Sequence, residues 1–516
     1  MNIKKIFLSQ KEILLNGLWI ILFIIIIIIM TMAFNFNIFN KNDGGSFENF
    51  QKDSEALVVG KILADKFNID TKNSGLGFIA FKEFIYPDKV IDSYAIYQQS
   101  KSFISDENWI NGIARKWTGF YITYSLENEK FFKIGSQIVF KNGDTRTITD
   151  VKKIGEECLN IYLIGDILNP KDVGIPLEFK KIENGITIHQ FDYHQYKSNY
   201  GAQGHLFSFL YNVLGIKHLG LFRLISAFLL AIVLVLICYL LIKPFGFAFS
   251  AIFYIVFLFS PWITSFARNL FWIPFTWFLP LLISLLILRE LKFFIYFLPL
   301  MFFSIFFKCL CGYEYITTIM LSGVSILIIS FFSIGKNKDR KKLFFAIIAI
   351  GIISLMAFFS ALLIHANITG DSLLKGLTSI WKDIVLRRTL GGNPSDYDLT
   401  VKDSLEATSF TVIRKYILNW STDVLYNFKG EAWFPFLFFT TAMIVIYNFF
   451  KKQKNYLPEL AMYLVFLTTT VSWFFLGKAH SYEHTHMNYV LWYFGFIQCA
   501  IYIIVKFFIR TSKNIL

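Results

Sequence analysis

Two carboxylates near the N-terminus, Asp53 and Glu55, are placed where they could take part in proton transfer. They lie in the run Lys52-Asp53-Ser54-Glu55, and the apolar residues of the segment that follows, SEALVVGKILADKF, have helical spacing. Carboxylates in the first turn of a helix are stabilised by its dipole, so helix capping is one explanation. The other is a general base that accepts a proton from an attacking hydroxyl. Taken alone, the run favours capping.

Hydrogen-bonding side chains are concentrated in HQFDYHQYKSNYGAQGH (189–205), directly before the amphipathic segment LFSFLYNVLG. Such side chains suit sugar hydroxyls, and an amphipathic segment of this kind is typical of a membrane interface. The alternative is an ordinary linker, against which the density of polar side chains argues. The candidates for sugar or acceptor binding in this run are Asp192, His194, Tyr200, Gln203 and His205.

Basic residues that could hold a phosphate group occur at three further places. Arg268 lies in the short run ARN before LFWIPFTWFLP, where an interfacial anchor explains it equally well. Lys308 opens the run KCLCGYEY, in which a lone CxC pair is a weak metal signal and the cysteines are expected to pack. Arg387 and Arg388 precede a Gly-Gly turn whose backbone N–H groups could help to cradle an anion. A solvated charge pair competes with that interpretation.

The run KAHSYEHTHMN (478–488) is the most concentrated polar segment beside an apolar one. His480 and His484 are four residues apart and would share a helical face, so divalent metal binding has to be considered. The order H-x-x-E-H-x-H differs from H-E-x-x-H, and phosphate or sugar binding is favoured, with metal dependence left open. The donor-phosphate candidates are Arg268, Lys308, Arg387, Arg388, His480 and His484. The remaining sugar or acceptor candidates are Tyr313, Glu314, Glu483, His486 and Asn488.

The composition of the chain predicts that a membrane fold positions these runs. Of its 516 residues 55% are hydrophobic and 17% charged, which argues against a disordered or nucleic-acid-wrapping protein. The five cysteines form no disulfide framework. A membrane-spanning helix needs about 20 mainly apolar residues. The segments predicted to span are 18–34, 219–242, 247–266, 270–288, 293–307, 315–334, 343–365, 432–450, 456–476 and 489–509.

The distribution of charge predicts the orientation of these ten spans. With both termini in the cytoplasm, the inner segments carry 17 basic and four acidic residues, which is +13 of the net charge of +14. The excess of basic residues is therefore an orientation signal and gives no evidence for a nucleic-acid partner. All eight histidines fall in outer loops or at outer ends of spans. We expect an integral protein of a bacterial inner membrane, with its site on the extracytoplasmic face.

The expected fold class is mainly α, with about ten transmembrane helices and a small α+β or β-rich extracytoplasmic domain inserted after the first helix. Residues 1–34 form a basic segment and an uncleaved anchor. The extracytoplasmic domain, 35–218, is expected to be helical over 50–130, β-rich over 131–190, where turn signals separate short strands, and interfacial over 200–216. Helices two to seven fill 219–365, an outer loop fills 366–431, and the last three helices fill 432–516.

The chain resembles the GT-C superfamily of integral-membrane glycosyltransferases, and within it a group of bacterial surface-polysaccharide proteins. The segments that carry the resemblance are KDSEALVVGKILAD, SNYGAQGHLFSFL, ARNLFWIPFTWFLP, KCLCGYEYITTIM and KAHSYEHTHMNYVLWYFGF. The resemblance implies a many-helix membrane domain, a site built from outer loops and a polyprenyl-phosphate-linked sugar donor. It also implies an acidic base in the first outer loop, for which Asp53 matches best and Glu55 second. The β-rich insertion and the lack of a DxD motif in that loop depart from the pattern.

The resulting hypothesis is a membrane glycosyltransferase that moves a sugar onto a surface-glycan or lipid-linked acceptor, with Asp53 as the general base. A polysaccharide polymerase or ligase is the nearest rival, since Arg387 and Arg388 in a long outer loop suit it almost as well. A transporter or flippase would be expected to carry charges within its spans, and a structural or sensory protein built around the β-rich module is a further alternative.

Overall fold

The computed structural model describes most of the chain. The described residues are 3–40, 47, 50–66, 68–85, 90–93, 118–123, 129, 132–139, 145–154, 158–163, 180–181, 186–188, 191–215, 218–333, 337–389, 392–396, 399–420, 422–453 and 456–515. Much of the expected extracytoplasmic domain, including 94–117, 164–179 and His189, lies outside them.

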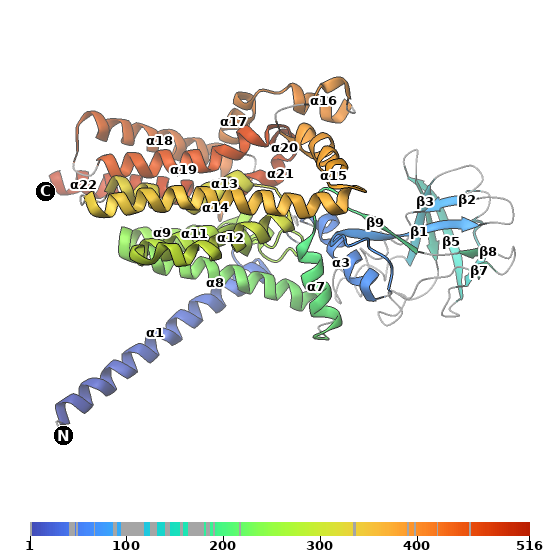
Figure 1. Cartoon of the computed structure of the whole chain (residues 1–516), viewed down its shortest axis with the longest axis horizontal. Helices are drawn as coiled ribbons and strands as arrows, with labels where there is room; N and C mark the ends of the chain where they lie inside the picture. Colours follow the sequence, from blue (N-terminus) through green and yellow to red (C-terminus); the bar gives the residue numbers. More distant parts are fainter. Residues whose placement is uncertain are drawn as a thin grey trace.

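The larger part of the molecule is a bundle of apolar helices, as the composition predicts (Figure 1). Its helices are α8 (Leu219–Phe245), α9 (Phe247–Leu258), α10 (Pro261–Ala267), α11 (Phe275–Arg289), α12 (Phe294–Cys311), α13 (Ile316–Ser333), α14 (Asn337–Thr369), α18 (Gly430–Phe450), α19 (Tyr456–Leu476) and α22 (Phe496–Ile515). Large apolar side chains on the outer surface, such as Phe303, Phe359 and Phe436, are exposed. Such a surface suits lipid and not water.

Seven of the described helices are long and apolar enough to cross a membrane, and up to nine spans result if each of two bent helix pairs counts as one. The chain is therefore a polytopic α-helical membrane protein, although the number ten is not confirmed. The predicted span 270–288 is the 15-residue helix α11, which is shorter than a full crossing. The span 247–266 is bent by 63° where Ser260 caps α10 and Pro261 occupies its first turn.

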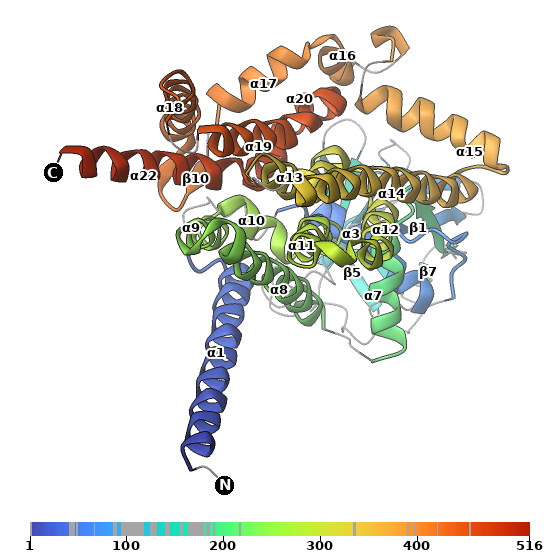
Figure 2. The ribbon, with the colours of Figure 1, turned by 60° about the vertical axis from the view of Figure 1, so that its left-hand side comes forward.

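The first helix, α1 (Ile3–Phe36), diverges from the bundle in both views (Figures 1 and 2). Its second half packs against α8, whereas residues such as Trp19, Ile21 and Ile28 are exposed. Both chain termini lie at the end of the bundle opposite the β-sheet (Figure 1).

A nine-stranded sheet lies beyond the other end of the bundle. Its strands are β1 (Gly77–Ile85), β2 (Val90–Ser93), β3 (Thr118–Thr123), β4 (Gln137–Val139), β5 (Thr145–Ile154), β6 (Cys158–Leu163), β7 (Lys180–Lys181), β8 (Ile186–Ile188) and β9 (Phe191–Gln195). The order is β2-β1-β8-β7-β4-β5-β6-β3, with β9 also paired to β1, and every pairing is antiparallel.

The prediction of a helical segment over 50–130 holds for α3 (Lys52–Lys66) and is wrong at the strands that the structure describes after it. The run Gly77–Ile85 is a strand, as is Thr118–Thr123. The run GFIAFKEFI is apolar enough to suit either structure, and its pairing with β9, from Gly77 opposite Gln195 to Phe81 opposite Phe191, decides for the strand. The β-rich module thus begins well before residue 131. The interfacial segment contains α7 (Ala202–Asn212).

The second long loop is mostly helical. It contains α15 (Leu373–Ser379), the π-helix η2 (Ile380–Leu386), the short helix η3 (Pro394–Asp396), α16 (Leu399–Glu406), α17 (Ser409–Leu418) and the hairpin β10 (Asp423–Leu425) and β11 (Phe428–Lys429). After α19 come α20 (Lys478–Glu483), α21 (Thr485–Asn488) and η4 (Tyr489–Tyr493). The Tyr416 hydroxyl of α17 donates a 2.7 Å hydrogen bond to the Ser481 carbonyl, which fixes α17 against α20.

Candidate functional site

Helix α3 presents its two predicted carboxylates to different surroundings. Asp53 lies exposed in the first turn, whereas Glu55 is buried. The Glu55 carboxylate accepts two hydrogen bonds from Arg223 in α8, one of them 3.1 Å long from Nε and the other from Nη2 at 2.5 Å. A bidentate guanidinium engages both oxygens, so Glu55 is not available as a base and instead fixes the start of α3 on the bundle. Its predicted catalytic role is therefore not supported by its contacts, and Asp53 remains the candidate.

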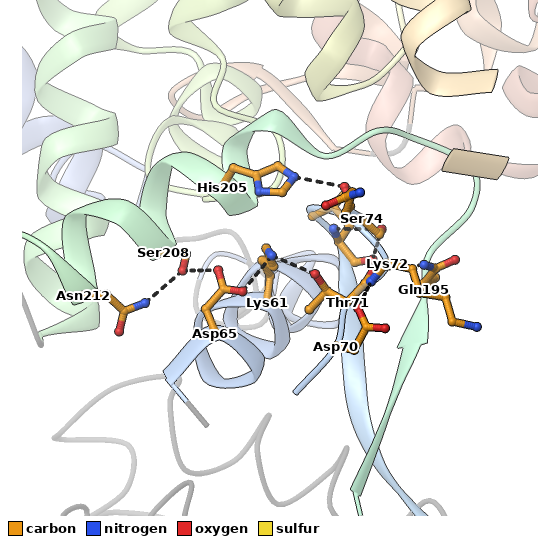
Figure 3. A network of polar contacts seen from close by, with 12 residues as sticks. Lys61, Asp65, Asp70, Thr71, Lys72, Ser74, Gln195, His205, Ser208 and Asn212 are labelled. Carbon is orange, nitrogen blue, oxygen red and sulfur yellow. Dashed lines mark hydrogen bonds and ion pairs between the residues drawn. The ribbon is translucent and has the colours of Figure 1, made fainter. Parts of the chain in front are cut away.

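A second polar network holds the other end of α3 against α7 (Figure 3). Lys61 donates to Asp65 at 2.8 Å and to the Thr71 hydroxyl at 2.9 Å, and the Ser208 hydroxyl of α7 donates to Asp65 at 2.5 Å. The two backbones approach closely beside it, since a Cβ on Gly204 would lie 1.7 Å from the Gly75 carbonyl oxygen. Helix α3 is thus held at both ends.

The predicted sugar-binding residues of the 189–205 run do not lie together on one surface. Asp192 lies in β9, where His194 stacks on Phe78 with a ring separation of 5.2 Å. His205 contacts the Asn73 carbonyl beside the network of Figure 3, and burial, reinforced by the charge of Lys61, lowers the pKa of this imidazole.

Two more residues of that run have structural contacts. Gln203 is fully buried and donates two 2.9 Å hydrogen bonds, to the carbonyls of Phe271 and Cys311. The ring of Tyr200 lies 5.4 Å from that of His205. The polar side chains of this run are close in sequence, but they serve three different parts of the fold.

The histidine run of 480–486 forms a chain of rings that leads back to α3. The ring of His484 lies 4.6 Å from that of His480 and 5.6 Å from that of His486. His486 Nε2 lies 3.4 Å from the side-chain nitrogen of Gln51, one residue before α3, and the charge of Asp53 acts on the His486 ring. The predicted base and the predicted histidine run are therefore brought together.

Arg388 brings a cation to the same place from the second long loop. Its guanidinium lies 3.3 Å from the Glu314 carboxylate and donates longer hydrogen bonds, of 3.4 Å each, to the hydroxyls of Tyr196 and Ser198. The charges of Arg388 and the more exposed Arg387 both act on His484. Two predicted sites, the Arg pair and the Glu314 run, thus meet at the histidines.

Burial makes these histidines weak bases. It lowers the pKa of His480 well below its usual value, with the neighbouring His484 and Arg388 acting in the same direction. For His484, burial is again the main cause, His486 and Arg388 add to it, and the pKa falls to about 4. At neutral pH the positive charge of the site therefore comes from its arginines.

The remaining two predicted phosphate ligands contact the backbone. The guanidinium of Arg268 stacks on Phe47 at 3.9 Å and donates to the Phe47 carbonyl at 3.4 Å. Lys308 is buried in the last turn of α12 and donates to the Gly312 carbonyl at 2.5 Å. Both hold the loops that flank the site, and neither is brought to the histidine run by these contacts. The charge of Glu314 also acts on Lys308, so this lysine lies on the Glu314 side of the site.

Several buried polar atoms around Arg388 and Glu314 have no hydrogen-bond partner within the described residues. Both side-chain polar atoms of Asn199, the hydroxyl of Tyr313 and Nδ1 of His365 and His480 are in this state. Asn199 lies against Gly312, where its amide nitrogen would be 3.2 Å from an added Cβ and the Glu314 carboxylate 2.5 Å. Buried polar groups are normally paired, so unpaired atoms gathered beside one ion pair mark this region as a candidate binding site.

Sequence analysis missed several of the residues that build this site. His365 binds the Lys197 carbonyl at 2.9 Å and lies beside Tyr313, although it appears in the sequence only as the end of a span. Asn199, Tyr196 and Ser198 stood inside the polar run, and its density was the only signal. Arg223 had none, because it lies among apolar residues.

The predicted Asn488 and Glu483 lie beside the histidines. Asn488 is buried and accepts a 2.8 Å hydrogen bond from the Tyr315 hydroxyl. Glu483 accepts from the Ser404 hydroxyl of α16 at 3.0 Å. Among the residues that the structure describes, no group of three or more histidine, cysteine, aspartate or glutamate side chains is arranged to hold a metal ion.

Comparisons of the chain with protein-family models, with curated proteins and with solved structures gave no match. The charge of the exposed Asp53, a carboxylate able to accept a proton, acts on one end of the histidine cluster. The charges of two arginines, whose guanidinium groups suit an anion, act on its middle ring.

Proposed function

We propose that the protein is a membrane glycosyltransferase that transfers a sugar from a polyprenyl-phosphate-linked donor to a surface-glycan or lipid-linked acceptor. The observation that carries the proposal is that the charge of Asp53 in α3 acts on the histidine run, on which the charges of Arg387 and Arg388 also act, although Asp53 is more than 300 residues from both other segments. A base and a cationic group joined by one cluster of side chains are what this transfer requires.

In the proposed reaction, Asp53 accepts the proton of an acceptor hydroxyl, whose oxygen then attacks the anomeric carbon of the donor. Negative charge develops on the departing lipid phosphate, and preorganised cations stabilise it. Arg388 is held by Glu314, Tyr196 and Ser198, so its guanidinium needs little reorganisation as that charge appears.

We further propose that the site faces the extracytoplasmic side of a bacterial inner membrane and that both termini face the cytoplasm. The support is that the termini lie at the end of the bundle opposite the sheet (Figure 1), and that the loops on the side of the termini carry the excess of Lys and Arg. A lipid-linked donor would enter such a site from the outer leaflet.

A polysaccharide polymerase or ligase is the second candidate, because Arg387 and Arg388 come from a long loop and act on the same histidine cluster. An enzyme that joins preassembled chains also needs to hold a lipid phosphate. Product size separates the two, since a transferase extends its acceptor by one sugar and a polymerase by whole blocks.

Replacement of Asp53 tests the proposed base. In proteoliposomes supplied with a panel of polyprenyl-phosphate monosaccharides and a glycan acceptor, Asp53→Asn should lower transfer by about 10²- to 10⁴-fold, the usual contribution of a general base. The control is Asp371→Asn, since Asp371 is a highly exposed carboxylate paired at 3.8 Å with Lys375 in the second long loop. Full transfer by Asp53→Asn would remove Asp53 from the mechanism.

A further inference from the structure

The three rings of His480, His484 and His486 connect the two halves of the site. At one end, His486 contacts Gln51, and the negative charge of Asp53 acts on its ring. The acceptor proton would be released at this end. At the other end, the positive charge of Arg388 acts on the rings of His484 and His480. An anion would be held there. His484 lies between its two histidine neighbours, with ring separations of 4.6 and 5.6 Å.

The charged and titratable groups that face His484 come from every element packed around it. Its own segment supplies two histidines and Glu483, whose carboxylate lies 3.9 Å from Nε2. The loop after α12 supplies the carboxylate of Glu314. The residues that follow η2 supply the guanidinium groups of Arg387 and Arg388. These neighbours are His480, Glu483, His486, Glu314, Arg387 and Arg388.

Without an anion, this environment disfavours a positive charge on the ring. Burial and the surrounding cations lower the pKa of His484 to about 4, so the ring is neutral at pH 7. A phosphate diester beside Arg388 would offset the positive charge of the arginines. It would therefore raise the pKa of His484 and favour the imidazolium form. Anion binding and proton uptake would then be thermodynamically linked.

We propose that His484 takes up a proton when a phosphate diester binds beside Arg388, and that it acts as the general acid of the transfer. This inference rests on the proposed function for its catalytic half, whereas the proton-coupled anion site rests on the ring contacts of His484 and on the position of Arg388 beside them. The phosphodiester is that of the lipid-linked sugar donor, which carries a single negative charge.

The proposed step is balanced in atoms and electrons. The bond between the anomeric carbon and the phosphate oxygen breaks, its electron pair stays on that oxygen, and the oxygen receives the proton of His484. The acceptor oxygen bonds to the anomeric carbon and gives its proton to Asp53. After the step His484 is neutral and Asp53 is protonated, and His486, which lies between them, can return the proton.

Proton uptake can be measured on the intact protein without any transfer reaction. We would titrate the detergent-solubilised chain with farnesyl methyl phosphate, a phosphodiester with no group that titrates near neutral pH, by calorimetry at pH 7 in buffers of different ionisation enthalpy. A neighbouring anion raises a pKa by about 1–3 units, which brings that of His484 from about 4 to at most about 7, so wild type should take up as much as about half a proton for each molecule bound. His484→Gln should lose most of this uptake, and the control His218→Gln, at the exposed histidine directly before α8, should keep it.

The wild-type titration decides the proposal even where His484→Gln does not fold. Binding without proton uptake, or no binding of the phosphodiester at all, would overturn it, as would full uptake by a folded His484→Gln. Uptake in a protein that transfers no sugar from any lipid-phosphate donor would instead overturn the proposed function and keep the anion site.

The pH dependence of transfer tests the general acid. In wild type, kcat should fall as the pH rises above the pKa that His484 has in the donor complex. His484→Gln should have a kcat about 10²- to 10⁴-fold lower, without this alkaline limb. An unchanged alkaline limb in His484→Gln would show that another group supplies the proton.

Discussion

Each end of the helical bundle holds a buried carboxylate between basic side chains, and the two clusters differ in how completely their polar atoms are paired. On the side of the termini, Glu459 of α19 accepts from Asn448 at 2.9 Å and pairs with Lys506 at 3.0 Å and Arg510 at 2.7 Å. These contacts join α18, α19 and α22. We call this group the Glu459 cluster.

On the side of the sheet, Glu314 pairs with Arg388, but buried atoms of the adjoining Asn199, Tyr313, His365 and His480 have no partner within the described residues. We call this group the Glu314 cluster. An unpaired buried polar group costs about 1–3 kcal/mol, so several of them in one place reduce stability. The Glu459 cluster is therefore a clamp between helices, whereas the Glu314 cluster keeps unpaired buried atoms at a cost in stability, which fits the proposed binding site.

The largest expected difference in stability comes from replacing the two carboxylates. Glu459→Gln leaves two cations without their counter-charge and should destabilise the fold by about 2–3 kcal/mol, a value reduced because Lys506 and Arg510 are each about a third exposed. Glu314→Gln removes the negative charge that acts on Arg388 and on the buried Lys308. It leaves Arg388 its two hydroxyl partners and Lys308 the Gly312 carbonyl, so it should cost less, about 1–2 kcal/mol.

Thermal unfolding in detergent measures the loss of stability in both variants, and a sugar-transfer assay measures their activity. Glu314→Gln should lower transfer strongly although the protein remains folded. Glu459→Gln should leave the transfer rate per folded molecule equal to that of wild type. Equal losses of stability in the two variants would contradict the division into clamp and site.

A matched pair of asparagines sharpens the comparison with a smaller effect. Asn448→Ala removes a donor from Glu459 and should destabilise by about 1–2 kcal/mol. Asn199→Ala removes two buried polar atoms that have no partner within the described residues and should leave the unfolding midpoint unchanged or raise it. The rate of sugar transfer should be lowered by Asn199→Ala and not by Asn448→Ala. A lower unfolding midpoint for Asn199→Ala would mean that its amide is paired in the folded protein.

The helical bundle could be predicted because long apolar runs leave a chain few alternatives in a membrane. Hydropathy alone did not give the bends, since Pro261 and Gly495, which has a φ of 114°, interrupt runs that are apolar throughout. The strand β1 was missed for a related reason. Its run GFIAFKEFI suits a helix or a strand, and only pairing with β9, more than 100 residues later, selects the strand.

The candidate site was predicted in its parts and not in its contacts. Asp53, Arg388 and the histidines were found because unusual polar residues stand beside apolar runs. The pairing of Glu55 with Arg223 joins residues 168 positions apart, and Arg223 is one cation in an apolar run with no local sign of a partner. Whether a polar residue serves as a clamp or a ligand depends on such tertiary partners, which spacing along the chain does not contain.

The smallest expected effect is the response of stability to acid, and it also separates the two clusters. His480 and His484 have a lower pKa in the folded protein than the value of 6.5 in an unfolded chain, with about 4 for His484. The unfolded state therefore binds more protons as the pH falls below about 6.5, and stability should decrease from there towards pH 4. The midpoint of thermal unfolding should fall by a few degrees between pH 7 and pH 5.

His484→Gln should reduce this acid dependence, whereas Glu459→Gln should lower the midpoint by a similar amount at both pH values, because the Glu459 cluster contains no histidine. Farnesyl methyl phosphate should also reduce the acid dependence in wild type, since a bound anion raises the proton affinity of His484 in the folded state. An acid dependence that is the same in wild type and His484→Gln would mean that the histidine is not held neutral by the fold. The Glu314 cluster would then be a permanently charged site and not one that gains its proton with its ligand.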